Sequence, residues 1–215
     1  MVKEVQYERK TQQRVPLSDA FFNPELVYRP GKLDEFLVGL ATQPSQNYDN
    51  IVTEEVTNHL FQGRNKSFGM DLVALNIQRG RDHGLAGYNE FRELCGLGRA
   101  SRFSQMSDLI PAVIVERLQL IYQHVDDVDL FIGGLSESPV AGGLVGPTFQ
   151  CLIGDQFKRT MIGDRHFYDS SASPGRFTEQ QLAEIRNSNL ARITCDNGDN
   201  IKLMQPLAFR RQATK

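Results

Sequence analysis

The segment at residues 69–84, GMDLVALNIQRGRDHG, constrains the fold more than any other part of this 215-residue chain. Its apolar residues recur at the i, i+3, i+4, i+7 spacing of a helix face: Met70, Val73, Ala74 and Ile77. The same spacing defines a second face, made of Leu72, Leu75, Asn76 and Arg79. A helix that is apolar on two sides is expected to lie buried between layers. We therefore predict a helix over about 69–81 that carries an amide and a guanidinium into the interior.

Asn76 and Arg79 would then each need a partner, because a buried polar group without one costs roughly 1–3 kcal/mol, and a charge costs more. One interpretation is structural: Arg79 bonds the last carbonyls of its own helix, and Asn76 bonds a loop. The other is functional: this face meets a flat, apolar, anionic ligand, with Arg79 on its carboxylate and Asn76 orienting a neighbouring group. The residues alone leave both open.

The remaining patterns predict a mainly α fold with many short helices and little or no strand. Further helices are expected near 32–40, from Thr53 onward, and near 87–95, 111–123 and 147–161. Pro111 is expected at the first helical position, although the β-branched run at 113–115 keeps a strand possible there. The clearest helix start lies at 177–186, where Thr178 and Gln181 have capping-box spacing.

Charge and hydropathy exclude several classes of protein. The net charge is −2, with 24 basic and 26 acidic residues, so no clustered positive excess indicates a nucleic-acid partner. No apolar run is long enough to predict a transmembrane segment, and the first ten residues have no apolar core of a signal peptide.

The reactive side chains form no catalytic or metal-binding pattern. Four histidines, none at ligand spacing from another, are expected to be structural: His59, His83, His124 and His166. In Arg81-Asp82-His83-Gly84 we expect a helix-ending turn, with Asp82 paired to an arginine and Gly84 in the left-handed conformation. Asn65-Lys66-Ser67 fits a glycosylation sequon, a pattern that is frequent by chance. The three cysteines are either reduced thiols or one disulfide plus a thiol without a partner: Cys95, Cys151 and Cys195.

At residues 75–92, LNIQRGRDHGLAGYNEFR, the chain resembles the animal haem peroxidases, the superfamily of myeloperoxidase, peroxidasin and the chorion peroxidases. Further segments resemble the family in the same order: VPLSDAFF at 15–22, DLFIGGLSE at 129–137, VGPT at 145–148, GDRHFY at 163–168 and ITCDN at 193–197. The resemblance implies that residues 1–215 are the C-terminal part of one mostly helical haem-binding domain.

The resemblance assigns roles to individual residues. Asn76 matches the asparagine that hydrogen-bonds the proximal histidine, and Arg79 matches the arginine at a haem propionate. Leu72 and Leu75 match apolar contacts to the proximal side of the ring. Cys95 and Cys151 match a disulfide pair of the family, whereas Cys195 matches a cysteine whose partner lies further downstream.

No histidine of this chain matches the family's proximal or distal histidine, and the distal arginine and the calcium loop also have no counterpart here. The resemblance therefore implies part of an extracellular haem peroxidase that reduces hydrogen peroxide and oxidises a halide or phenolic donor. This part would supply the proximal wall of the haem pocket, be inactive alone, and need the N-terminal part of the same domain. The alternative is a non-catalytic helical interaction module derived from a peroxidase.

Overall fold

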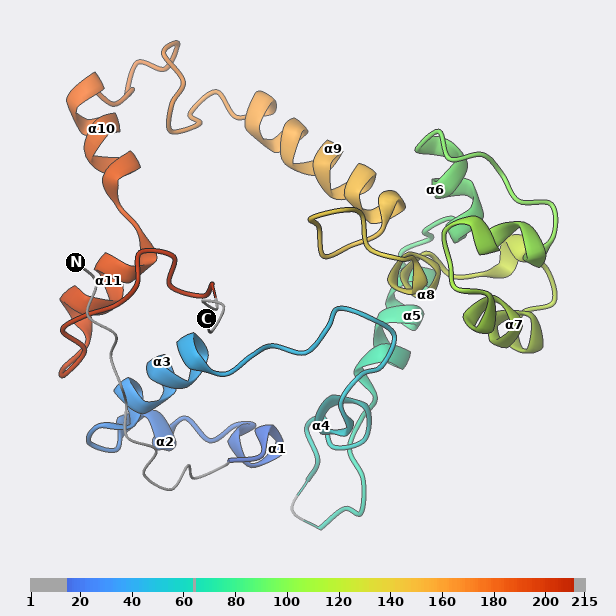
Figure 1. Cartoon of the computed structure of the whole chain (residues 1–215), viewed down its shortest axis with the longest axis horizontal. Coiled ribbons are helices and arrows are strands. Elements are labelled where there is room, and N and C mark those ends of the chain that lie inside the picture. Colours follow the sequence, from blue (N-terminus) through green and yellow to red (C-terminus); the bar gives the residue numbers. More distant parts are fainter. Residues whose placement is uncertain (1–14, 64, 211–215) are drawn as a thin grey trace, which may run out of the picture. The chain divides into compact units, whose positions relative to one another are not determined.

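The computed structural model describes residues 15–63 and 65–210, which form two compact units (Figure 1). One unit consists of the described parts of Met1–Gln46 and Arg165–Lys215, and the other of Asn47–Asp164. Within the described ranges the chain contains helices and two isolated antiparallel bridges, Leu60–Met70 and Gly87–Asp129, but no strand. The prediction of a mainly α chain with many short helices is confirmed.

The first unit contains five helices among its described residues: α1 (Leu17–Ala20), α2 (Glu25–Tyr28), α3 (Lys32–Thr42), α10 (Glu179–Asn187) and α11 (Leu190–Asn197). The predicted capping box begins α10, because the Thr178 hydroxyl accepts from the Gln181 N–H while the Gln181 side chain accepts from the Thr178 N–H. The buried Asp34 joins α3 to the segment after α11 by accepting from the N–H groups of Asp199 (3.2 Å) and Asn200 (2.7 Å). Asp34 thus links two parts of this unit that are far apart in sequence.

The second unit contains α4 (Glu54–Thr57), α5 (Leu72–Asp82), α6 (Tyr88–Leu94), α7 (Ala112–Ile121), α8 (Leu130–Ser136) and α9 (Pro147–Gly163). Two 3-10 turns, η1 (Phe103–Asp108) and η2 (Val125–Asp127), lie between these helices. Residues 112–121 are helical, so the strand alternative is wrong. Pro111 is the N-cap of α7 and not its first helical residue, because its backbone (φ −52°, ψ 135°) is not helical.

The core of the second unit lies between α6, η1 and α7. Nine buried side chains form it: Tyr88, Ala100, Phe103, Met106, Ile110, Val115, Leu118, Val125 and Val128. Arg92 of α6 is also buried, and its guanidinium donates to both carboxylate oxygens of Asp108 and to the carbonyl of Gly98 (2.7 Å). The Asp108 carboxylate neutralises the buried charge, and the Gly98 carbonyl accepts a further guanidinium N–H, so the desolvated group has partners.

A buried carboxylate joins α6, α8 and α9. Glu137, the C-cap of α8, is 5% exposed and accepts from the Tyr88 hydroxyl (2.7 Å) and from the Thr148 N–H (2.9 Å) and hydroxyl (2.5 Å). Two glycines of α8 allow the neighbouring rings to approach: a Cβ on Gly133 would lie 2.3 Å from Tyr88, and one on Gly134 would lie 2.4 Å from Phe149. The sequence GGLSE at residues 133–137 therefore allows α8 to pack closely against α6 and α9.

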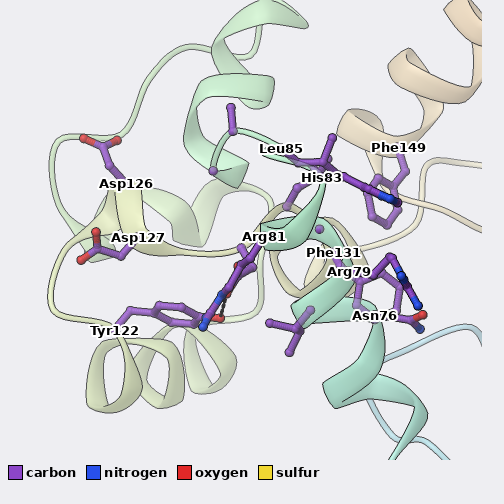
Figure 2. Close-up of a pocket in the computed structure, with 16 residues that line it drawn as sticks. Asn76, Arg79, Arg81, His83, Leu85, Tyr122, Asp126, Asp127, Phe131 and Phe149 are labelled. Atoms are coloured by element: carbon purple, nitrogen blue, oxygen red, sulfur yellow. Dashed lines mark hydrogen bonds and ion pairs between the residues drawn. The ribbon is translucent and has the colours of Figure 1, made fainter.

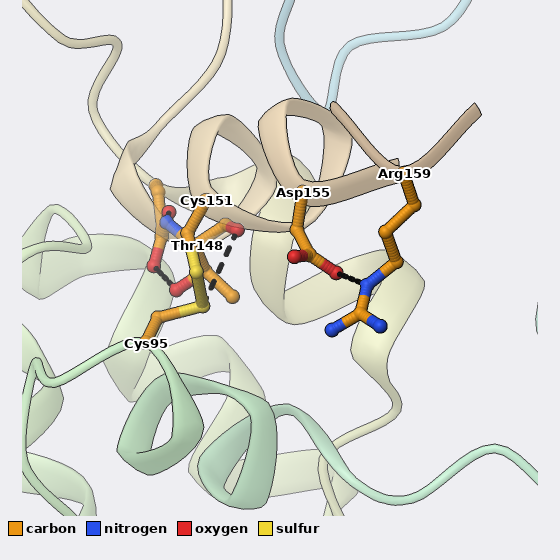
Figure 3. The surroundings of a disulfide bond; sticks show 6 residues. Cys95, Thr148, Cys151, Asp155 and Arg159 are labelled. Atoms are coloured by element: carbon orange, nitrogen blue, oxygen red, sulfur yellow. Dashed lines mark hydrogen bonds and ion pairs between the residues drawn. A yellow bond between two sulfur atoms is a disulfide. The ribbon is translucent and has the colours of Figure 1, made fainter. Parts of the chain in front are cut away.

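A disulfide also attaches α9 to the end of α6. Cys95 and Cys151 are bonded, with their Cα atoms 6.0 Å apart (Figure 3). Cys195 is free. The pairing implied by the family resemblance is confirmed, and of the two interpretations of the three cysteines, the disulfide with one unpaired thiol is correct. Among the helices that the structure describes, none combines the length and apolar content needed to cross a membrane.

Candidate functional site

The ends of α5 are fixed by local hydrogen bonds. Asp71 is the N-cap, and its carboxylate accepts from the N–H groups of Val73 (2.9 Å) and Ala74 (3.1 Å). At the other end the Leu85 N–H donates to the Gly80 carbonyl and the Gly84 N–H to that of Arg81, each at 3.0 Å. This is a Schellman motif, which needs a left-handed residue, and Gly84 supplies it with φ +65°. The predicted turn at Gly84 is confirmed.

Asn76 and Arg79 lie one turn apart on α5 and line the same open groove of about 640 Å³ (Figure 2). The groove also contains the turn after α5, Tyr122, η2, the start of α8, and Phe149 of α9. Figure 2 shows Asn76, Arg79 and His83 gathered near Phe131 and Phe149, with Asp126 and Asp127 at the opposite side. Polar groups of α5 thus face an apolar aromatic wall.

The predicted burial of α5 is wrong for this chain. No residue of α5 is buried, Leu72 is 36% exposed, and the Arg79 side chain is 68% exposed. The helix packs against α8 and α4, and these neighbours are not enough to cover two apolar faces. Leu72 and Leu75 share the helix with Asn76 and Arg79 but do not line the groove. The structure therefore joins the two polar candidates in one site and leaves the two leucines outside it.

Arg81 is neutralised by a partner within the groove. Its guanidinium donates to both carboxylate oxygens of Asp129, at 2.9 and 2.6 Å, and Asp129 also accepts from the Tyr122 hydroxyl (2.8 Å). The hydrogen bond from Arg81 lowers the pKa of Asp129 despite partial burial. Burial, followed by the hydrogen bond to Asp129, raises the pKa of Tyr122 to about 12. Arg81, Tyr122 and Asp129 consequently form one closed set of contacts.

Arg79 and Asn76 are engaged much less. The closest ion pair of Arg79 is with Asp82 at 3.8 Å, which confirms that Asp82 pairs with an arginine but leaves most guanidinium donors available. Within residues 15–63 and 65–210, Arg79 bonds no helix carbonyl and the Asn76 side chain has no hydrogen-bond partner, so the structural interpretation of these two residues is not what the structure shows. A guanidinium and an amide free to bind, beside an aromatic wall, fit a flat apolar ligand that carries a carboxylate.

The aromatic lining of this groove could not be located from the sequence. Phe131, Phe149 and Tyr122 are distant from α5 in sequence, and only the packing of α8 and α9 brings the two phenylalanines to it. Among the described residues, no group of three His, Cys, Asp or Glu side chains is arranged to hold a metal ion. The lining of the groove combines polar and aromatic side chains.

Comparisons with known proteins agree with the sequence resemblance. The family model for animal haem peroxidases matches residues 1–209. The protein named Peroxidase of Drosophila melanogaster is 45% identical over 194 residues, which are 90% of this chain and 28% of that protein. Peroxidase-like protein 3 of Lottia gigantea is 41% identical over 196 residues, which are 91% of this chain and 63% of that protein.

A solved structure resembles the fold directly. Peroxidase A of Dictyostelium discoideum matches with a TM-score of 0.78 and 32% sequence identity, over 93% of this chain and 37% of that one. This chain thus spans 28% of the Drosophila protein and 37% of the Dictyostelium protein, and most of its length is similar to one portion of each.

Proposed function

The chain belongs to the animal haem peroxidase family, and on this premise we propose that it forms the proximal wall of a haem pocket in an extracellular peroxidase. The complete enzyme would reduce hydrogen peroxide and oxidise a halide or a phenolic donor. The observation that supports this most is the shared groove of Asn76 and Arg79 on α5, where neither side chain is committed to another strong partner.

Each residue has a distinct task in this proposal. Arg79 would bind a haem propionate, because its guanidinium presents several donors and Arg81 beside it is already occupied by Asp129. Asn76 would accept the ring N–H of the proximal histidine, which fixes the tautomer of that histidine and strengthens it as a ligand. Leu72 and Leu75 lie outside the groove, and we assign them contacts to the proximal side of the ring on the family resemblance alone. Haem, when bound, supplies the redox chemistry on peroxide.

The axial histidine, the distal histidine and arginine, and the calcium site of the family would come from the part of the domain outside these 215 residues. We therefore propose that the isolated chain neither binds haem through an axial histidine nor turns over peroxide. The exposure of Leu72 on α5 supports this, because the described neighbours of α5 within its unit leave that side chain uncovered.

A chimera tests the proposal. Residues 15–210 would replace the matching segment of the Drosophila relative, and haem content, ferrous iron–histidine vibration and guaiacol oxidation would be measured. We expect Arg79→Ala to weaken haem binding by about 10- to 100-fold, the scale of a charged hydrogen bond. Asn76→Ala should shift the iron–histidine vibration and lower activity by about 10- to 100-fold.

Gln78→Ala is the matched control, since Gln78 is exposed on the same helix and does not line the groove. If Gln78→Ala equals the other two variants in its effects, the assigned roles are wrong. A histidine-ligated Soret spectrum together with guaiacol oxidation by the isolated chain would overturn the proposal that it is inactive alone.

A non-catalytic interaction module is the second candidate, and the shortness of one relative is the reason to test it. This chain spans 63% of the peroxidase-like protein of Lottia gigantea, a far larger share than it spans of the Drosophila enzyme. Cooperative unfolding of the isolated chain without binding of the dye ANS would support a module that is stable by itself. Strong ANS binding and loss of near-ultraviolet circular dichroism would support an incomplete domain.

A further inference from the structure

The loop between α4 and α5 contains a glycosylation sequon that has no role in the proposed haem pocket. Asn65-Lys66-Ser67 is the sole Asn-X-Ser/Thr sequence in the chain, and its middle residue is not proline. A sequon becomes an acceptor only where its asparagine amide is accessible to a glycosyltransferase, which requires an exposed loop and not a helix.

The loop is closed at its base. Leu60 and Met70 form an antiparallel bridge, in which the Met70 N–H donates to the Leu60 carbonyl (2.7 Å), and the Gly69 N–H donates to the Asn58 carbonyl (2.5 Å). Gly69 allows this close approach, because a Cβ there would lie 2.5 Å from the Leu60 carbonyl oxygen. Figure 1 shows the loop extending beyond α4, away from α7 and α8.

The backbone next to the acceptor is held from two sides. The Lys66 N–H donates to the Gly63 carbonyl (3.0 Å), and the Gln62 side-chain amide donates to the Lys66 carbonyl (2.5 Å). Gln62 is itself positioned by His59, whose Nδ1 lies 2.6 Å from its Oε1. These contacts involve only the backbone of the sequon, and they leave the side chains of Asn65 and Ser67 available.

Asn65 and Ser67 are both exposed, and neither side chain hydrogen-bonds to any other described residue. No residue of the loop lines the groove that contains Asn76 and Arg79, so a glycan on Asn65 would leave that groove open. The position thus combines an accessible amide, an accessible hydroxyl and distance from the candidate pocket.

We propose that Asn65 is an N-glycosylation site of this protein. This rests on the extracellular location given in the proposed function, because the donor is a lipid-pyrophosphate-linked oligosaccharide in the secretory pathway. In the transfer, Nδ2 of Asn65 forms a bond to C1 of the first sugar and loses one proton to the transferase. The bond from C1 to the pyrophosphate oxygen breaks, and the lipid pyrophosphate leaves.

The experiment expresses the chain behind a cleavable secretory leader in cultured insect cells. We expect a single glycosylated species that peptide-N-glycosidase shifts to the mobility of the unmodified chain. Asn65→Gln and Ser67→Ala should each abolish the shift, whereas Ser67→Thr should retain it. Unmodified wild-type chain, or a shift that persists in Asn65→Gln, would overturn the proposal.

The Cys95–Cys151 disulfide separates failure of this proposal from failure of the proposed function. Its formation, measured by thiol labelling, reports that the chain entered an oxidising compartment. A disulfide-bonded chain without a glycan refutes the site and leaves the peroxidase assignment intact. The haem-binding chimera tests that assignment without any glycan.

Discussion

Glu137 offers the sharpest test of how the second unit is held together. Its carboxylate is buried and receives three hydrogen bonds, one from α6 and two from Thr148 of α9. Glu137→Gln preserves the shape but replaces one carboxylate oxygen with an NH₂ group. Oε1 accepts from both hydroxyls and Oε2 accepts from the Thr148 N–H, so an NH₂ group at Oε2 would face an N–H that can only donate. An NH₂ group at Oε1 would instead require both hydroxyls to turn and accept from it.

The size of the effect follows from these contacts. The orientation that keeps the amide oxygen on the buried Thr148 N–H costs less, and each of the three hydrogen bonds weakens by about 1 kcal/mol when Glu137 loses its charge. The neutral amide is less costly to bury, which offsets part of this loss. We therefore expect a net loss of about 2–3 kcal/mol. With a urea m-value of about 2 kcal/mol/M, the midpoint should fall by about 1–1.5 M.

Urea unfolding followed by far-ultraviolet circular dichroism measures this, since the chain has no tryptophan. Glu93→Gln is the matched control: its carboxylate is 55% exposed and pairs with Arg99 at 3.1 Å, so we expect a change below about 1 kcal/mol. Equal midpoints for the two variants would show that the buried carboxylate does not join α6, α8 and α9 energetically.

Three further predictions concern the same unit. Replacing both Cys95 and Cys151 with alanine opens a loop of 56 residues and should cost about 4 kcal/mol by the chain-entropy relation, whereas Cys195→Ala should leave the urea midpoint almost unchanged. Arg92→Lys cannot reproduce the two-pronged contact with Asp108 and should lower stability by about 2–3 kcal/mol in thermal unfolding; an unchanged melting temperature would contradict this. Tyr122, with its pKa raised from 10.0 to about 12, adds stability that is complete below pH 10 and is lost as the pH rises toward 12. Tyr122→Phe should remove this alkaline loss, and an identical pH dependence in the variant would refute the assigned contact.

Much of the helical structure could be predicted from local sequence. The capping box of Thr178 and Gln181 and the left-handed Gly84 act within a few residues, so their geometry is encoded where they stand. The i, i+3 spacing of Asn76 and Arg79 likewise guaranteed that they share one side of α5. These features need no knowledge of the rest of the chain.

The tertiary structure alone decided what surrounds that side of α5. The aromatic wall of Phe131 and Phe149, and the capture of Arg81 by Asp129 across 48 residues, depend on where α8 and α9 pack. The predicted burial of α5 was wrong because apolar periodicity indicates which faces can be covered, whereas covering them requires neighbours that the described residues of its own unit do not supply. Spacing along a helix is a local property, and the partner of each face is set by long-range packing.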